Sequence, residues 1–415
     1  MERKHTIDDL YQMQSLPLKY KVIMTQQRIR GWYDHWDGDV YVSFSGGKDS
    51  TVLVDIVTKM GYTDIPLVFI DTGLEYPEIR EFVKGYGDRV TWLRPSMTFK
   101  QVIEKYGYPF FGKEIAETVS GARKYLKEYF NRAEDTDMSE VKYVANARHM
   151  AEIIGLRAQG DRKEEMTKKV EDVFTGVSSK YKWGGVSGYL LMLLGKYPHT
   201  ENGKLTNEMS SRYNRKKYLF MLEAPFEISK NCCTVMKKGP AHKYAKETGR
   251  KPITAQMASE SKLRTSQWLT NGCNGFDMKE PISNPMSFWT DQDVLLYIKQ
   301  NNLPICSVYG DVIEDREGTE EVEGQLTMSD IEGWEDQDPF DAKRLPLKTT
   351  GCSRTGCMFC GFGCQMEKEE GRFERMKKTH PKQYDYIMRP SDQGGLNYKQ
   401  VIDWINENGN MHIKY

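Results

Sequence analysis

The hydrophobic and polar positions in the N-terminal part of the chain change between a helical and a strand pattern. Apolar residues recur at helical spacing within residues 1–37, which predicts a helical segment. Short β-type runs then stand at residues 40–44, 66–72 and 90–95, separated by segments of helical pattern. The second run is continuously apolar, as expected for a strand buried on both faces. This order of strands and helices predicts an α/β fold with a parallel sheet.

Farther along the chain the pattern becomes mainly helical and then mixed. Residues 111–217 are polar, basic and largely helical in pattern, and we expect an inserted helical subdomain there. Runs of β type return at residues 218–226 and 252–258. The second part of the sheet is therefore expected after the insertion.

Two later helices have recognisable ends. Thr290 is the expected N-cap of one helix, with Asp293 as the acid of a capping box. A final amphipathic helix is expected to stop at Gly409. Together these elements predict a parallel, doubly wound α/β sheet with an inserted helical subdomain and a C-terminal Cys-rich module. The predicted segments are, in chain order, 1–37, 38–110, 111–217, 218–312, 313–342 and 343–415.

Composition and charge exclude several classes of protein. The 415 residues include 59 Lys and Arg against 59 Asp and Glu, so attraction of the whole molecule to nucleic acid or membrane is not expected. Charge is uneven, however: residues 314–341 are strongly acidic and residues 204–251 are mainly basic. No apolar run has the length of a membrane span, and the first residues have no secretory pattern, so we expect a cytoplasmic protein without a membrane partner.

The strongest motif is a glycine-containing loop between a predicted strand and a predicted helix. It consists of Ser45, Gly46, Gly47, Lys48, Asp49 and Ser50. The glycines allow a phosphate to approach the backbone, and the helix that follows presents its positive end to an anion. The lysine neutralises phosphate charge, the serines donate hydroxyls, and the aspartate offers oxygen to Mg²⁺. A capped Gly-Gly turn without a ligand is the alternative interpretation.

This loop, within VSFSGGKDS, resembles the pyrophosphatase (PP) loop of the adenine-nucleotide α-hydrolase superfamily. Within that superfamily the chain resembles the phosphoadenosine phosphosulfate (PAPS) reductase family. Three further segments support the resemblance. They are FIDTGLEYPE at residues 69–78, Cys232-Cys233 followed by Met236-Lys237-Lys238, and Ala258-Ser259-Glu260-Ser261 followed by Arg264.

The resemblance implies roles for individual residues. The loop would bind the phosphate or sulfate of ATP or PAPS, with Lys48, Asp49 and Arg264 acting in catalysis. Other positions would contact the nucleotide or its anionic end, and these are Asp71, Thr72, Glu75, Lys237, Lys238, Ser261 and Arg264. Two alternatives stay open: a structural ion pair of Arg264 with Glu260, and a solvated basic turn at the two lysines.

The cysteines are confined to the second half of the chain, which is typical of metal or redox chemistry rather than of a disulfide framework. Four of them, Cys352, Cys357, Cys360 and Cys364, are closely spaced. A Cys-x2-Cys pair suits zinc or an iron–sulfur cluster. Buried free thiols are the alternative, above all for Cys306.

Two ligand sets are open. In the first, the four closely spaced cysteines form a local site. The second resembles the arrangement that holds a four-iron cluster in adenylyl-sulfate reductases of the family. It consists of Cys357 and Cys360 together with Cys232, Cys233 and Cys273. The second set is preferred because it uses the earlier cysteines, and zinc remains the alternative metal.

Three functions follow from the resemblance. The first is sulfonucleotide reduction, with a protein that donates electrons or sulfur as a partner. The second is ATP-dependent, adenylating sulfur transfer to nucleic acid, as in DNA phosphorothioation or tRNA thiolation. The third is a nucleotide-sensing subunit without catalysis, and assembly as a homo-oligomer also stays open. Thioredoxin-dependent reductases resemble one another in a C-terminal Cys-Gly-x-His-type segment; no cysteine follows Cys364 here, which favours the second function.

Overall fold

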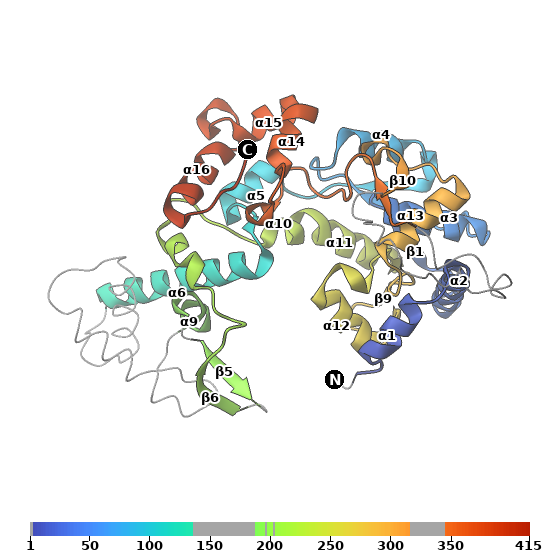
Figure 1. Ribbon diagram of the computed structural model, residues 1–415, viewed down its shortest axis with the longest axis horizontal. Coiled ribbons are helices and arrows are strands. Elements are labelled where there is room, and N and C mark those ends of the chain that lie inside the picture. Colours follow the sequence, from blue (N-terminus) through green and yellow to red (C-terminus); the bar gives the residue numbers. More distant parts are fainter. Residues whose placement is uncertain (1–2, 136–186, 196, 202–203, 316–344) are drawn as a thin grey trace, which may run out of the picture. The chain divides into compact units, whose positions relative to one another are not determined.

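A computed structural model describes residues 3–135, 187–195, 197–201, 204–315 and 345–415 (Figure 1). The greater part of the predicted helical insertion and nearly all of the acidic segment lie outside these residues. The described residues form two compact units. The first comprises Met1–Ser96 and Met236–Met358, and the second comprises Met97–Val235 and Phe359–Tyr415.

The first unit contains a six-stranded sheet in the order β3-β2-β1-β7-β9-β8. All neighbouring strands are parallel except β8, which is antiparallel to β9. The strands are β1 (Val40–Ser43), β2 (Leu67–Ile70), β3 (Val90–Leu93), β7 (Lys251–Ile253), β8 (Asn274–Gly275) and β9 (Ile282–Ser283). The predicted α/β class with a largely parallel sheet is confirmed.

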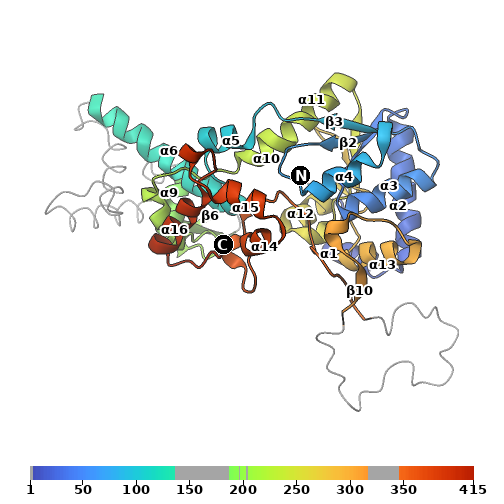
Figure 2. The ribbon, with the colours of Figure 1, turned by 90° about the horizontal axis from the view of Figure 1, so that it is seen from above.

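Seven helices of this unit surround the sheet in the part of the chain that the structure describes. They are α1 (Ile7–Gln14), α2 (Leu18–His35), α3 (Lys48–Lys59), α4 (Pro77–Lys84), α11 (Gly239–Thr248), α12 (Lys262–Asn271) and α13 (Asp291–Asn301). Helices α2, α3 and α13 pack against one another (Figure 2). The predicted capping box is present, because Asp293 N donates to Thr290 Oγ1 and Thr290 N donates to Asp293 Oδ2.

Short elements complete the first unit. Strands β10 (Val312–Glu314) and β11 (Leu347–Thr349) form an antiparallel pair, and η1 (Gly87–Arg89), η4 (Ala258–Glu260) and η5 (Ser307–Tyr309) are 3₁₀ turns. A continuous apolar core that includes Trp32, Val42, Leu53 and Trp289 fills the space between the sheet and its helices. This core fixes the end of β1 and the start of α3, which is where the glycine loop lies.

The second unit is mainly helical. Its helices are α5 (Phe99–Tyr106), α6 (Lys113–Asp135), α9 (Gly188–Leu194), α10 (Asn231–Cys233), α14 (Arg372–Thr379), α15 (Pro381–Met388) and α16 (Tyr398–Gly409). Two strand pairs accompany them: β4 (Phe110–Phe111) with β12 (Gly361–Phe362), which is parallel, and β5 (Pro198–Glu201) with β6 (Lys204–Met209), which is antiparallel. Three short turns are η2 (Lys216–Glu223), η7 (Cys364–Met366) and η8 (Ser391–Gln393).

The core of the second unit joins segments that are far apart in the sequence. The buried Tyr398 ring lies 5.5 Å from Tyr108, 5.3 Å from Phe110 and 5.9 Å from Phe373 between ring centroids. The region before the predicted insertion and the C-terminal region therefore share one apolar cluster. This division of the chain differs from the six segments expected from sequence, because aromatic contacts across long sequence separations define it.

Three local predictions were wrong. Residues 218–226 were expected to form a strand, but η2 covers most of them. Tyr218, Met221 and Leu222 are its buried positions, and their spacing is helical rather than alternating. The strand expected over 252–258 is confined to β7, which ends at Ile253.

The third concerns the end of the last helix, for which Gly409 was expected to be the stop. Gly409 is the final residue inside α16, and Asn410 in the left-handed conformation (φ 47°) ends the helix. A side chain at Gly409 would collide with the Phe220 ring, so close packing rather than helix termination requires glycine there.

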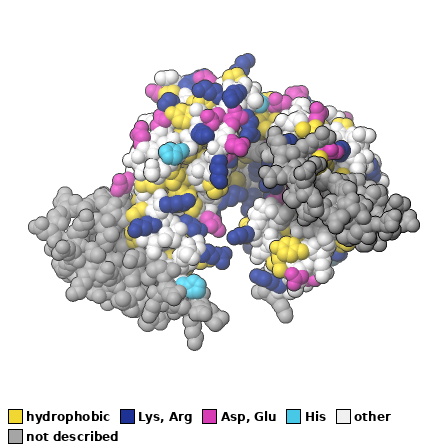
Figure 3. Space-filling view, in the orientation of Figure 1, with side chains coloured by type: hydrophobic (Ala, Val, Ile, Leu, Met, Phe, Trp, Pro, Cys, Tyr) yellow, Lys and Arg dark blue, Asp and Glu magenta, His cyan; other side chains and the backbone are white. Residues whose placement is uncertain are grey.

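The described surface carries both signs of charge. On the face drawn in Figure 3, Lys and Arg side chains are interspersed with Asp and Glu side chains. No helix among the described residues combines the length and the apolar character that a membrane crossing requires.

Candidate active site

The glycine loop lies at the point of the sheet where ligands bind in open parallel α/β folds. It follows β1, whose neighbours are β2 on one side and β7 on the other. The chain continues from β1 to β2 on one side, and the later strand β7 lies on the other side. The carboxyl end of β1 is therefore a topological switch point. The residues at this end, Ser45 to Ser50, are those that the sequence selected as the phosphate loop.

Glycine is required at Gly46 by both conformation and space. Its φ is +70°, and a Cβ there would lie 2.8 Å from Val83 Cγ2 and 2.9 Å from Ile79 Cγ2 of α4. The loop is braced by hydroxyls: Ser45 N donates to Ser50 Oγ at 3.2 Å, and the two serine hydroxyls lie 3.0 Å apart. The backbone conformation of the loop is therefore held by its own side chains.

Lys48 is the central charge of the site. Its side chain is 1% exposed, and Nζ donates to Asp49 Oδ1 at 3.0 Å and to Asp291 Oδ1 at 2.7 Å. Burial alone lowers the pKa of Lys48, but the two carboxylates outweigh burial and raise it above the ordinary lysine value. The side chain is thus a fixed cation beside the loop.

Two hydroxyl residues outside the predicted set also contact the loop. Lys48 N donates to Tyr309 OH at 3.1 Å, and Tyr309 OH shares a 2.5 Å hydrogen bond with Thr355 Oγ1. A Cβ at Gly47 would lie 3.2 Å from Tyr309 OH. Tyr309 and the segment around Thr355 therefore form part of the wall above the loop.

A second charged group lies near the loop. Glu260 in η4 forms ion pairs with Arg264 of α12 and with Arg354, the latter at 3.1 Å. The ion pair that the sequence left open for Arg264 is therefore present. Ser261 is the N-cap of α12 and accepts from Arg264 N at 3.3 Å.

Electrostatics connects this group with the loop. Burial lowers the pKa of Arg264, the neighbouring Arg354 lowers it further, and Asp49 opposes both. Asp49 therefore interacts electrostatically with Arg264 as well as with Lys48, which links the two charged groups.

The segment after β2 adds acceptors. Asp71 is buried, and its Oδ2 accepts from Arg80 Nη2 at 2.9 Å. Its buried Oδ1 has no hydrogen-bond partner within the described part of the chain. Glu75 accepts from Thr72 N at 3.0 Å and from Thr72 Oγ1 at 2.7 Å, so it closes a turn. Of these three predicted residues, Asp71 has a buried carboxylate oxygen without a hydrogen-bond partner among the described residues.

The two lysines after the Cys-Cys pair lie in the π-helical turn η3 (Thr234–Lys238). Lys237 is half-buried and Lys238 is exposed. Within the described residues no ion pair links Lys238 with the loop. A solvated turn remains the simpler interpretation of Lys238.

Three cysteines of the second unit gather around Tyr398. Burial raises the pKa of Tyr398, with further contributions from Cys360, Cys232 and Cys364. Cys364 Sγ donates to Gly361 O at 2.9 Å, and burial raises the pKa of Cys364 to about 12. Cys364 is therefore held as a neutral thiol. Cys232 and Cys360 interact with the same tyrosine.

The other buried cysteines occupy the apolar core of the first unit. Cys273 and Cys306 both belong to that core, and burial raises the pKa of each thiol. Among the described residues, no group of three or more His, Cys, Asp or Glu side chains is arranged to hold a metal ion. Cys273 fits a core thiol better than a metal ligand, since a ligand must lose its proton.

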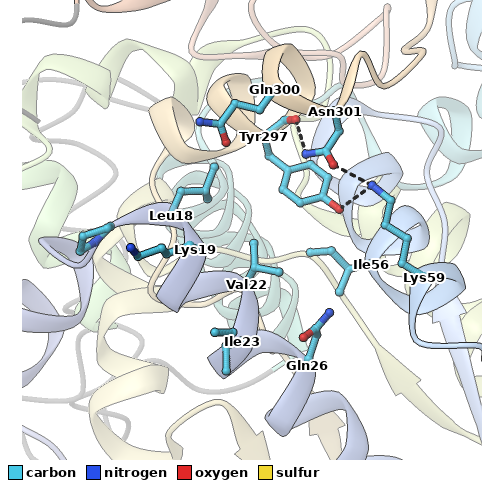
Figure 4. A pocket seen from close by; sticks show the side chains of 11 residues that line it. Leu18, Lys19, Val22, Ile23, Gln26, Ile56, Lys59, Tyr297, Gln300 and Asn301 are labelled. Atoms are coloured by element: carbon cyan, nitrogen blue, oxygen red, sulfur yellow. Dashed lines mark hydrogen bonds between the residues drawn. The ribbon is translucent and has the colours of Figure 1, made fainter. Parts of the chain in front are cut away.

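A cavity elsewhere in the first unit is apolar. It measures about 410 Å³ and lies between α2, α3 and α13, with Leu18, Val22 and Ile56 in its wall (Figure 4). At its edge Lys59 Nζ donates to Asn301 Oδ1 at 2.8 Å. None of the loop residues lines this cavity.

Comparison with known proteins decides the family. The model of the phosphoadenosine phosphosulfate reductase domain matches residues 39–183 and 197–361, which is most of the chain. The chain belongs to the PAPS reductase family. The matched residues include the loop, Glu260, Arg264 and Arg354, so the predicted family is confirmed over the site described above.

Individual relatives are similar over shorter stretches. Two uncharacterised proteins of Methanocaldococcus jannaschii are 38% identical over 85 residues (20% of this chain, 18% of the relative) and 32% identical over 96 residues (22% and 23%). A phosphoadenosine 5′-phosphosulfate reductase of Serratia proteamaculans is 27% identical over 120 residues (28% and 48%). The chain therefore spans less than half the length of each of these relatives.

One solved structure is similar to the chain at low sequence identity. It is a phosphoadenylyl-sulfate (PAPS) reductase of Candida auris in a phosphate complex, with 13% identity and a TM-score of 0.31. The match covers 68% of this chain and 82% of that structure. The family assignment rests on the domain match, and the fold on the sheet itself.

Proposed function

We propose that this PAPS reductase-family enzyme binds an adenylyl sulfate at the loop and reduces its sulfate. The observation that carries the proposal is the buried cation Lys48 at the switch point of the sheet, within the loop that the family domain covers. A protein that donates electrons or a thiol is the partner, because reduction of sulfate to sulfite requires an outside reductant.

The site residues suit this substrate. Backbone N–H groups at the start of α3 and the charge of Lys48 neutralise the phosphate. In this proposal Arg264, which interacts electrostatically with Asp49 of the loop, stabilises charge on the sulfate end. The unpartnered Oδ1 of Asp71 is proposed to accept a hydrogen bond from a hydroxyl of the nucleoside. In this proposal the chain binds and orients the substrate, and the reductant supplies the electrons.

An iron–sulfur cluster is part of the proposal. Its proposed ligands are Cys232 and Cys360, which both interact electrostatically with Tyr398, together with the other member of each sequence pair, Cys233 and Cys357. Cys273 is left out of this set because it packs in the apolar core of the first unit. A bound cluster would supply electrostatic or redox assistance to the anionic substrate. Zinc on the same thiolates is the alternative metal.

A second candidate function is adenylating sulfur transfer to nucleic acid. Asp49 and Asp291 support it, since both carboxylates converge beside the loop and such oxygens are the ligands that Mg²⁺ prefers. Asp49 and Asp291 would hold Mg²⁺, which would neutralise charge on the phosphates of ATP. The target oxygen would attack the α-phosphorus, pyrophosphate would leave, and the target would become an adenylate.

One experiment separates these functions. Anaerobically purified protein is incubated with PAPS and a reductant, or with Mg²⁺ and ATP, and the products are identified. Sulfite with adenosine 3′,5′-bisphosphate supports reduction, whereas AMP with pyrophosphate supports adenylation. Binding of nucleotide without either product would overturn both and indicate a nucleotide-sensing subunit. Lys48→Ala should abolish the products, while Lys59→Ala at the other end of α3 should not.

A further inference from the structure

The feature that the proposed function leaves unexplained is a carboxylate that bridges two arginines. Glu260 is 15% exposed, and it pairs with Arg264, which is 34% exposed, and with Arg354, which is 53% exposed. The two guanidiniums therefore share a single carboxylate, and one positive charge remains uncompensated within the group. An anion that approaches it gains attraction from both arginines.

Glu260 is able to release Arg354 without leaving its place. Its Oε2 accepts from Met257 N at 2.9 Å, which anchors the carboxylate in the η4 turn. Its Oε1 accepts from Arg354 Nη2 at 3.1 Å on the exposed side. Loss of the second contact leaves the backbone bond intact, so exchange of partners does not require unfolding of the turn.

Arg354 also belongs to the segment that covers the loop. Its neighbour Thr355 bonds with Tyr309 OH, which in turn accepts from Lys48 N of the loop. Thr355 thus reaches the loop through Tyr309, and the residue before it, Arg354, belongs to the arginine pair. Arg264 of the pair also interacts electrostatically with Asp49 of the loop.

We propose that the Glu260 carboxylate occupies the place of an anionic group that the ligand carries beyond its α-phosphate. When such a ligand binds, its anionic group replaces Glu260 as the partner of Arg354 and Arg264. Arg354 is then a specificity-determining residue for adenylyl ligands that have an anionic group beyond the α-phosphate. This inference rests on the proposed nucleotide site. ATP and adenylyl sulfate have such a group, and AMP lacks it.

The test is the affinity of variants for three nucleotides and for inorganic pyrophosphate, measured by calorimetry. Arg354→Ala should weaken the binding of ATP and adenylyl sulfate by about tenfold or more, and the binding of AMP by less than about twofold. Arg354→Lys should restore part of the loss, because it keeps the charge without the planar donors. Glu260→Gln keeps an acceptor for Met257 N and should tighten ATP by about twofold to fivefold.

Arg389→Ala is the matched control. Arg389 pairs with Asp385 on the same helix and is about as exposed as Arg354, so its loss should leave every affinity unchanged. Equal losses of AMP and ATP in Arg354→Ala, or Glu260→Gln that binds ATP more weakly, would overturn the inference.

Failure of the proposed function has a different signature. If the wild-type protein binds no nucleotide, opposite shifts of pyrophosphate affinity in Arg354→Ala and Glu260→Gln still establish the arginine pair as an anion site. If neither variant changes pyrophosphate or nucleotide affinity, the role given to Glu260 and Arg354 is wrong even where nucleotide binding itself is normal.

Discussion

Lys48 shows how one residue combines structural and ligand-binding requirements. It is buried at the start of α3, and its charge is balanced by a neighbour in sequence, Asp49, and by a distant residue, Asp291. A buried ammonium without such partners would lose its proton. The raised pKa therefore means that the cation persists at any pH near neutrality.

Replacement of Lys48 by alanine should weaken nucleotide binding by about tenfold to a hundredfold, the usual cost of losing a charge-assisted hydrogen bond. Calorimetric titration with ATP and with adenylyl sulfate measures the effect. Lys59→Ala is the control, because Lys59 lies on the same helix and forms its own ion pair with Asp55. Unchanged affinity in Lys48→Ala would exclude this loop as the nucleotide site.

At the scale of elements, α2 and α13 are joined by a buried ion pair. Lys21 Nζ donates to both carboxylate oxygens of Asp293 at 2.8 Å, and the two side chains are almost inaccessible to solvent. Asp293 also caps α13 through Thr290. One carboxylate thus fixes both the start of a helix and its packing against another.

Asp293→Ala should lower the free energy of unfolding by about 3–5 kcal/mol, because it leaves the buried ammonium of Lys21 uncompensated. Chemical denaturation measures the loss. Asp9→Ala removes the acid of a comparable capping box that is exposed on α1 and should cost much less. Equal losses in the two variants would show that capping, rather than the buried charge pair, is what Asp293 contributes.

The sequence was informative about elements whose signals are local. Thr290 and Asp293 identified the start of α13, and the apolar run before Ser45 identified the strand β1. Lys21 was not identifiable as the partner of Asp293, since 272 positions separate them. Residues 218–226 were assigned to a strand because their β-forming residues outweighed the helical spacing of their buried positions.

At the scale of the whole molecule, long-range contacts decided what the sequence missed. The position of the glycine loop after β1 was predictable because its six residues are contiguous and follow a strand pattern. Four residues come to the loop from other segments, and no local pattern marks the first two of them: Asp291, Tyr309, Arg354 and Thr355. Arg354 and Thr355 had one signal that sequence alone offered, their position just before the Cys-x2-Cys pair.

The distribution of the cysteines over the molecule leads to the last prediction. Cys306 and Cys273 lie in the apolar core of the first unit, whereas Cys232 and Cys360 lie around Tyr398 in the second. If Cys232, Cys233, Cys357 and Cys360 hold an iron–sulfur cluster, anaerobic protein should be brown and contain about four iron and four sulfide per chain.

Single substitutions then assign the ligands by iron content and visible absorption. Cys360→Ser should lose the iron, and Cys273→Ser should keep it, because Cys273 packs in the apolar core of the first unit. Cys306→Ser is the matched control. Loss of iron in Cys273→Ser would restore that residue to the ligand set, and loss in Cys352→Ser and Cys364→Ser would select the local four-cysteine site. Colourless protein with stoichiometric zinc would leave the ligand assignment intact and exclude a redox role for the metal. Metal-free protein with normal turnover would contradict a metal centre altogether.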